Sequence, residues 1–116
     1  MKNIIYHNPN WSKSRKSVEI LKERVEKYQI IEYLKEGITI DELISIGKKL
    51  NLAPKDFIRK NDPIFKSESL GSFINDDNKI FNAIVNYPKL IERPIVIKNN
   101  KAIISRPPEL LYEFLL

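Results

Sequence analysis

A chain of 116 residues is long enough for one domain with its own core and too short for two comfortable ones. A hydrophobic fraction of 42% and a charged fraction of 30% are typical of a folded globular domain and exclude disorder. The chain has no cysteine, which excludes disulfides and thiol chemistry, and its one histidine leaves no cluster suited to a metal site. We therefore expect one globular domain without a bound metal.

The formal net charge of +5 raises the question of nucleic-acid binding, since basic domains bind phosphate backbones. The cations, however, alternate with acidic residues along the predicted helices, and no helix-turn-helix or ribonucleoprotein pattern is present. We expect solubilising charge and no nucleic-acid partner. No apolar run approaches the ~20 residues of a membrane span, and no secretory signal precedes the first polar residues, so we predict a cytoplasmic protein without a membrane partner.

The first part of the chain predicts a βαβ unit. Residues 4–6 are apolar and aromatic and predict a short buried strand. Residues 17–27 carry apolar side chains at the spacing of one helical face, which predicts a helix. Residues 28–33 are rich in β-branched and aromatic side chains and predict a second strand. Because a helix joins the two strands, we expect them to be parallel.

Residues 6–15, between this strand and this helix, read Tyr-His-Asn-Pro-Asn-Trp-Ser-Lys-Ser-Arg. A tight turn that enters a helix N-terminus forms an anion site, because unpaired N–H groups and the helix dipole point at one spot. We interpret Ser12 as the helix cap and Ser14 as a further hydroxyl donor, with positive charge from Lys13 and Arg15. Trp11 is unusual, because such a loop normally holds something small and reactive at that position.

The middle of the chain predicts helices. Thr39 and Glu42 have the spacing of a capping box, and the helix that they open places Ile40, Leu43, Ile44 and Leu50 on one face and ends at Asn51. A short helix follows at Pro54, residues 60–75 suggest loop or short helical turns, and a further helix runs from residues 76–77 to Pro88.

The last part of the chain predicts a β-hairpin and a helix. A strand begins at Pro94, Asn99-Asn100 is a turn that needs a positive φ, and residues 102–105 form the returning strand. A final helix would bury Leu110, Leu111, Phe114 and Leu115. The order is β-α-β, helical insertion, β-β-α. This order predicts an α/β protein with a mixed four-stranded sheet in the thioredoxin-like arrangement.

Five blocks of sequence, in this order, resemble the glutaredoxin-coupled arsenate reductases and their relatives, the Spx-type regulators. The blocks are residues 5–9 with 12–15, then 32–34, 58–61, 90–96 and 106–109. The resemblance covers nearly the whole chain. It implies a single thioredoxin-fold domain over residues 1–116, with the family's helical insertion at about residues 38–90.

The resemblance also implies a chemistry, which one residue contradicts. In the family, a loop cysteine attacks arsenate as a thiolate, glutathione attacks the adduct, and glutaredoxin completes the reduction to arsenite. A helix N-terminus and nearby cations lower a thiol pKa, which suits that mechanism. Trp11 stands at the cysteine position, and an indole forms neither a sulfur–arsenic adduct nor a mixed disulfide. As written, this chain should not reduce arsenate.

The remaining oxyanion machinery matches the family. The resemblance implies an oxyanion site, for arsenate, phosphate or sulfate, formed by Arg59, Arg93, Arg106, Ser12 and Ser14. Guanidinium groups suit tetrahedral oxyanions because they donate hydrogen bonds in pairs and keep their charge. The supporting loop residues would be His7, Asn8 and Pro94, the last resembling the cis-proline of thioredoxin folds. For any single arginine, the alternative is a surface ion pair. For His7, it is a packed, hydrogen-bonded residue instead of a proton carrier.

Several hypotheses stay open. Trp11 could plug the anion pocket, contact a partner at the surface, or stack over an arginine. The chain could be an anion-binding relative without activity, an Spx-like protein-interaction module, or an active reductase whose residue 11 has been altered. We expect no bound cofactor, with glutathione and glutaredoxin as co-substrates by resemblance only. Glutaredoxin or another protein is a candidate partner, and a monomer is the default.

Overall fold

The computed structural model describes residues 3–116, which form two compact units. The first unit contains the chain up to Glu36 together with Arg93–Leu116, and the second contains Gly37–Glu92. The predicted helical insertion at about residues 38–90 falls within the second unit. That the whole chain makes a single domain stays a prediction.

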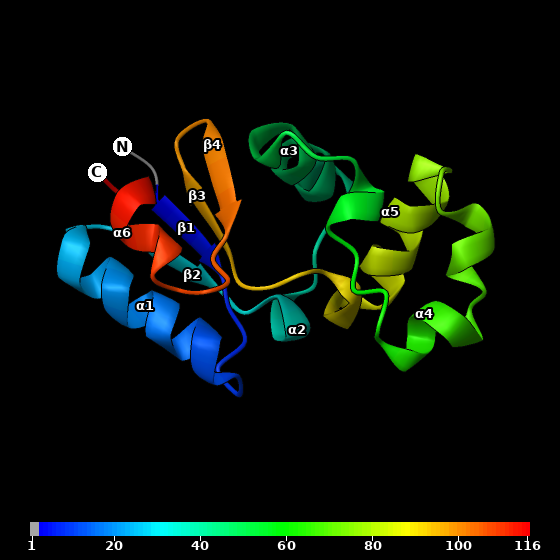
Figure 1. Cartoon of the computed structure of the whole chain (residues 1–116), viewed down its shortest axis with the longest axis horizontal. Helices are drawn as coiled ribbons and strands as arrows, with labels where there is room; N and C mark the ends of the chain where they lie inside the picture. Colours follow the sequence, from blue (N-terminus) through cyan, green and yellow to red (C-terminus); the bar gives the residue numbers. More distant parts are fainter. Residues whose placement is uncertain (1–2) are drawn as a thin grey trace. The chain divides into compact units, whose positions relative to one another are not determined.

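The first unit is built around a mixed sheet (Figure 1). Its elements in chain order are β1 (Asn3–Tyr6), α1 (Ser12–Arg24), β2 (Gln29–Ile31), α2 (Tyr33–Glu36), β3 (Ile95–Lys98), β4 (Lys101–Ile104) and α6 (Leu110–Phe114). The strand order is β2-β1-β3-β4, with β1 parallel to β2, and with β3 antiparallel to both β1 and β4. The predicted four-stranded mixed sheet and its parallel βαβ unit are confirmed.

One face of this sheet carries the core of the first unit. Ile5 of β1 lies opposite Val96 of β3, so that both side chains point to the same face, where α1 and α6 pack side by side (Figure 1). Ile20 and Leu21 of α1 and Leu111 of α6 complete a fully buried cluster. The predicted core face of the last helix is therefore too broad. Leu110 is 42% exposed, because α6 has little more than one turn and buries one side of it.

Three predicted boundaries in the βαβ unit are wrong. The first helix begins at Ser12, earlier than expected, and ends at Arg24, because Val25 is already extended. The second strand stops at Ile31, and Tyr33 begins α2 instead of continuing it. Local hydrogen bonds decide this turn: the Glu36 carboxylate accepts from the Glu32 N–H at 2.8 Å, and the Glu32 carbonyl accepts from the backbone. These hydrogen bonds outweigh the β propensity of Tyr33.

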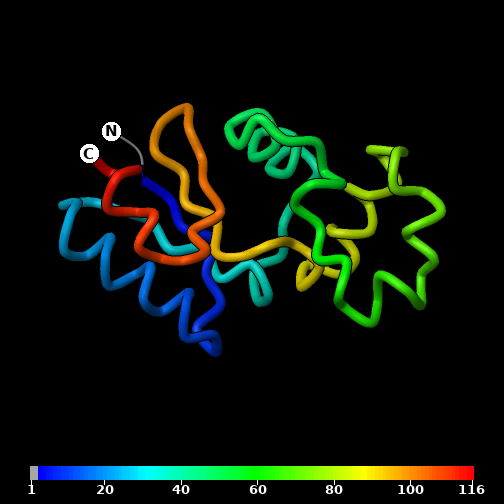
Figure 2. Tube along the Cα trace, in the orientation of Figure 1, coloured from blue at the N-terminus to red at the C-terminus, as the bar shows by residue number. Residues whose placement is uncertain are grey.

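The hairpin of β3 and β4 follows the prediction closely (Figure 2). Asn99 has a φ of 56°, the left-handed conformation expected for this turn, and the strands pair from Ile95 with Ile104 to Lys98 with Lys101. The hairpin therefore places the residues before β3 beside the residues after β4.

The second unit is helical. Its elements are α3 (Ile40–Leu50), the 3₁₀ turn η1 (Pro54–Asp56), α4 (Pro63–Ser67), the turn η2 (Leu70–Phe73), α5 (Asp77–Asn86) and the turn η3 (Pro88–Leu90). The predicted capping box of Thr39 and Glu42 is present in both directions, and Asn51 ends α3 in the left-handed conformation. The short helical turns expected within residues 60–75 are α4 and η2.

The buried face of α3 differs from the prediction. Leu43, Ile46 and Gly47 are buried, whereas Ile40 and Ile44 are 37% and 38% exposed. Gly47 explains the rotation of the buried face. A Cβ there would lie 3.2 Å from the Leu52 carbonyl oxygen and 3.5 Å from the Phe57 ring, so the helix approaches these groups through its bare backbone. The apolar spacing alone did not identify a glycine as the contact point.

Candidate oxyanion-binding loop

The loop between β1 and α1 ends with Trp11 as the N-cap of the helix. Trp11 has extended backbone angles, and its carbonyl accepts the N–H groups of Ser14 and Arg15, each at 3.1 Å. No side chain caps this helix, so the prediction that Ser12 is the cap is wrong: Ser12 is the first helical residue and is exposed. The chain enters the helix one residue earlier than the serine pattern indicated.

The N-terminal end of α1 is left as a positive pole. The first turn contains no acidic residue, and the N–H groups of Ser12 and Lys13 have no acceptor within a helix that starts at Ser12. Residue 13 is a lysine and Arg15 follows it, so the surrounding charge has the same sign as the helix pole. This arrangement favours an anion at the first turn.

The Ser14 side chain forms hydrogen bonds with two residues of the loop. Its hydroxyl is fully buried, lies 2.6 Å from His7 Nδ1 and accepts the Asn8 N–H at 3.0 Å. The Asn8 side chain in turn accepts the Asn10 N–H at 3.0 Å. The sequence prediction gave Ser14 a role in contacting the oxyanion. In this structure its hydrogen bonds go to His7 and Asn8, and its contact with an oxyanion stays a prediction.

His7 is a buried, hydrogen-bonded residue at the end of β1. Burial lowers its pKa, the Glu32 carboxylate opposes that shift, and the Arg15 guanidinium adds to it. The neutral imidazole is thus favoured, and its Nδ1 then shares one proton with the Ser14 hydroxyl. Of the two hypotheses made for His7, the packed residue describes its contacts.

Cationic side chains lie around the indole ring of Trp11. The guanidinium carbon of Arg93 lies 4.9 Å from the ring centroid, that of Arg106 lies 5.7 Å away, and Lys13 Nζ lies 5.9 Å away. These are cation–π distances. Of the three roles considered for Trp11, stacking with arginine is the one that its contacts show, and the ring is half-buried.

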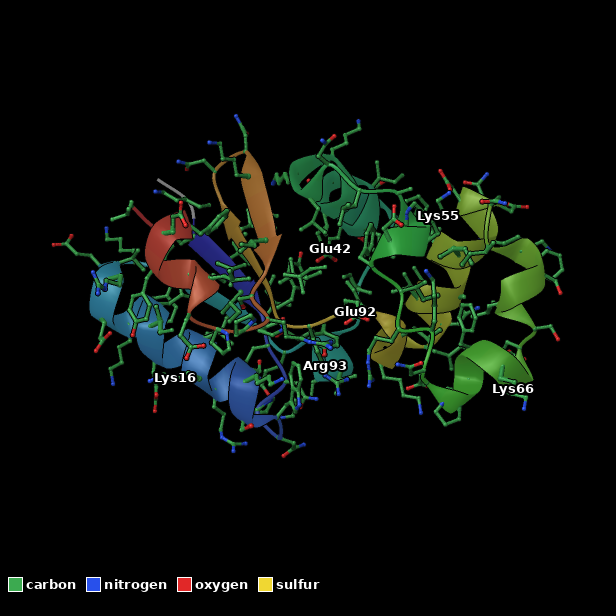
Figure 3. All side chains as sticks on the ribbon, viewed as in Figure 1. Lys16, Glu42, Lys55, Lys66, Glu92 and Arg93 are labelled. Carbon is green, nitrogen blue, oxygen red and sulfur yellow. The ribbon has the colours of Figure 1, made fainter. Side chains whose placement is uncertain are left out.

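The β3–β4 hairpin brings Arg93 and Arg106 together. Ile95 pairs with Ile104, and the Ser105 N–H donates to the Pro94 carbonyl at 2.9 Å, so the residues flanking both strands are neighbours. Arg93, labelled in Figure 3, lies at the end of the sheet where β3 begins. The Arg93–Pro94 bond is cis, as the resemblance implies. The Arg106–Pro107 bond is also cis, and no sequence pattern indicated it.

Arg93 has a donor without an acceptor. Its Nε is buried and has no hydrogen-bond partner. A buried guanidinium donor that stays unpaired is costly, and such groups usually have a partner in the functional state. An anion at the end of the sheet would provide one.

Arg59 belongs to the second unit, where it has its own partners. Its Nη1 lies 3.6 Å from the Asp62 carboxylate and donates to the Lys89 carbonyl at 3.3 Å. The buried Asp62 also caps α4 through the Ile64 N–H and lies 3.7 Å from Lys89 Nζ. The ion pair considered as an alternative for each arginine is therefore present for Arg59. Its membership of the oxyanion site stays a prediction.

Two buried serines behind the loop were not singled out from the sequence. Ser17 of α1 and Ser105 after β4 are fully buried, and their hydroxyl oxygens lie 2.9 Å apart. Serines in ordinary sequence contexts give no local signal of such a contact, because 88 positions separate them.

The part of the chain that the structure describes contains no group of three potential metal ligands. Within residues 3–116, no helix is long and apolar enough to cross a membrane.

Comparison with known proteins decides the family. The model of the ArsC family matches residues 6–114. The chain belongs to the ArsC family. It is 41% identical over 113 residues to an arsenate reductase of Haemophilus influenzae, covering 97% of each chain. It is 31% identical over 116 residues to an arsenate reductase of Escherichia coli, covering 99% of this chain and 82% of that one.

Solved structures confirm the fold of this ArsC-family chain. An arsenate reductase from Vibrio cholerae superposes with a TM-score of 0.91 at 37% identity, covering 97% of both chains. The predicted family and the predicted thioredoxin-like α/β fold are thus confirmed. The absence of cysteine sets this member apart from the cysteine mechanism that the resemblance implies.

Proposed function

We propose that this ArsC-family protein binds a tetrahedral oxyanion at the N-terminus of α1 and does not reduce arsenate. The observation that carries the proposal is Arg93. Its buried Nε has no partner, and its guanidinium lies against Trp11, the N-cap residue of a helix whose first turn has no side-chain cap and no acidic residue. Arsenate, phosphate and sulfate have the charge and shape that this set of donors would bind.

Stacking on Trp11 is compatible with anion binding. A guanidinium can lie against an aromatic ring with its flat face, and its N–H donors then lie in the plane of the group, along its edge. Contact through the flat face would fix the orientation of Arg93 without occupying the donors. In this proposal the indole positions an arginine where the family's cysteine would attack.

Reduction is excluded from the proposal by chemistry. The family mechanism needs a thiolate to form the bond to arsenic and then to exchange with glutathione and glutaredoxin. The chain contains no cysteine, and the hydroxyl of Ser14 is buried and committed to His7 and Asn8. Glutathione and glutaredoxin would be co-substrates only of a form that carries cysteine at residue 11. The cytoplasmic location and the monomeric state remain part of the proposal.

Fluorescence titration of the single tryptophan tests the proposal directly. The purified protein is titrated with arsenate, phosphate and sulfate while the indole emission is followed, with Arg93→Ala and Arg59→Ala as comparison variants. We expect a saturable change that Arg93→Ala loses. A flat response of the wild type, reproduced by calorimetry, would overturn the proposal and favour the Spx-like interaction module.

One alternative is an active reductase whose residue 11 has been altered. It is favoured by the intact surroundings of Trp11: the helix end, the hydrogen-bonded His7 and Ser14, and the two arginines. Sequencing the gene at codon 11 distinguishes an altered residue from a natural tryptophan. A cysteine codon would replace the proposed binding protein with an active enzyme.

A further inference from the structure

We propose that the buried hydroxyl pair of Ser17 and Ser105 positions Arg106 against Trp11 and thereby sets the geometry of the oxyanion site. This inference deepens the proposed function and rests on it. The pair joins two segments that carry parts of the site. Ser17 lies in α1, the helix that Trp11 caps, and Ser105 directly precedes Arg106.

The direction of the hydrogen bonds follows from the single hydrogen that each serine hydroxyl carries. The Ser17 hydroxyl donates to the Lys13 carbonyl at 3.0 Å. A serine hydroxyl has one hydrogen, so Ser17 can only accept in its 2.9 Å contact, and Ser105 donates. The chain of bonds therefore runs from the Ser105 hydroxyl through Ser17 to the carbonyl of Lys13 in the first turn of α1.

Backbone bonds extend this link to both arginines. The Ser105 N–H donates to the carbonyl of Pro94, the residue after Arg93, at 2.9 Å. The Arg106 N–H donates to the Ile104 carbonyl at 2.9 Å, which turns the chain sharply at Ser105. Ser105 thus contacts the Arg93 segment through its backbone and the helix through its side chain.

Burial makes the pair specific. Both serines are 0% exposed, so water cannot replace a lost partner, and shifting α1 against the hairpin would take the acceptor from the buried Ser105 hydroxyl. The pair is connected to the site through the chain: Ser105 directly precedes Arg106, and the Ser17 hydroxyl donates to the Lys13 carbonyl. Its effect would pass through Arg106 and Lys13, which makes Ser17 and Ser105 positioning residues.

The test separates positioning from stability. Removing Ser17 leaves the buried Ser105 hydroxyl without this acceptor, whereas removing both hydroxyls leaves a small apolar contact, which is often close to neutral for stability. The double variant Ser17→Ala/Ser105→Ala is therefore the informative protein. The readout without any ligand is the ¹⁵N–¹H signal of the Trp11 indole, which is the only indole signal of this chain.

We expect the Arg106→Ala change to move the indole signal strongly in the wild-type background and clearly less in the double-alanine background. Equal movement in both backgrounds would overturn the proposal. As a control, Thr39→Ala removes the capping box of the second unit and should leave the response of the indole to Arg106→Ala unchanged.

Anion titration adds a second readout. If the wild type binds phosphate, the double-alanine variant should bind it about threefold to tenfold more weakly, with no further loss on Arg106→Ala. Full additivity of the two changes would also overturn the proposal. If the wild type binds no anion, the proposed function fails, while the coupling measured by the indole signal still decides the role of the serine pair.

Discussion

The arginines of the two units are held in different ways. In the first unit, Arg93 lies against an indole ring and keeps a buried Nε without an acceptor. In the second unit, Arg59 lies beside a buried carboxylate and donates to a backbone carbonyl. An aromatic ring orients a guanidinium and leaves its donors available, whereas a carboxylate uses them. From this difference we predict that Arg93 contributes more to anion binding than Arg59.

The sharpest way to break this comparison is the Trp11→Cys variant, which removes the ring and introduces a thiol. The helix N-terminus and the adjacent cations should hold the pKa of the new thiol below that of free cysteine. The pKa is measured from the absorbance of the thiolate as pH is varied. We expect this variant to reduce arsenate in a glutathione–glutaredoxin assay in which the wild type shows no turnover.

Trp11→Ser is the matched control, since it also removes the ring but introduces no thiol. Reduction by both variants, or by the wild type, would contradict the assignment of residue 11. An unshifted thiol pKa in Trp11→Cys would contradict the positive pole at the start of α1.

The second largest effect should come from Arg93→Ala. Hydrogen bonds to charged groups contribute about 1.5–3 kcal/mol, so the affinity for phosphate or arsenate should fall by about tenfold or more. Arg59→Ala should weaken binding less, because Arg59 already has Asp62 and a carbonyl as partners. Calorimetric titration measures both. A larger loss for Arg59→Ala would reverse the comparison and support the oxyanion role predicted for Arg59.

Thr39→Ala tests whether a change confined to the second unit lowers stability without changing anion affinity. The Thr39 hydroxyl accepts the Glu42 N–H at 3.1 Å, and the backbone N–H of Thr39 donates to the Glu42 carboxylate at 3.1 Å. Loss of such a cap costs about 1 kcal/mol in the free energy of unfolding. Urea denaturation should show this loss, with anion affinity unchanged. A large drop in affinity would mean that α3 matters to the site.

The smallest effect concerns pH. Burial lowers the pKa of His7 in the folded state, so the unfolded chain binds more protons below the ordinary histidine pKa of 6.5. This group therefore favours unfolding as pH falls through 6.5 toward the lowered pKa, and adds no pH dependence well above 6.5. A His7→Gln variant should lose less stability than the wild type on acidification through that window. Parallel curves from thermal unfolding would contradict the burial effect.

Patterns within a few residues predicted much of this protein. The capping box at Thr39, the positive φ at Asn99 and the strands around them depend on local chemistry, and the structure confirms them. The cap at Ser12 and the strand at Tyr33 were wrong, because neighbouring backbone bonds competed with the side-chain preference. Local rules identify the competing hydrogen bonds but not which of them forms.

By itself, the sequence determined the family, the order of strands and helices, and the absence of the nucleophile, since each depends on residue identity and spacing alone. Only the tertiary structure decided what Trp11 contacts, that Ser14 supports the loop, and that Ser17 meets Ser105. The contacts of Trp11 and Ser17 join residues that face each other only after the hairpin and α1 have packed on one sheet. This packing determines which polar groups are buried, and burial limits the hydrogen-bond partners that each of them can find.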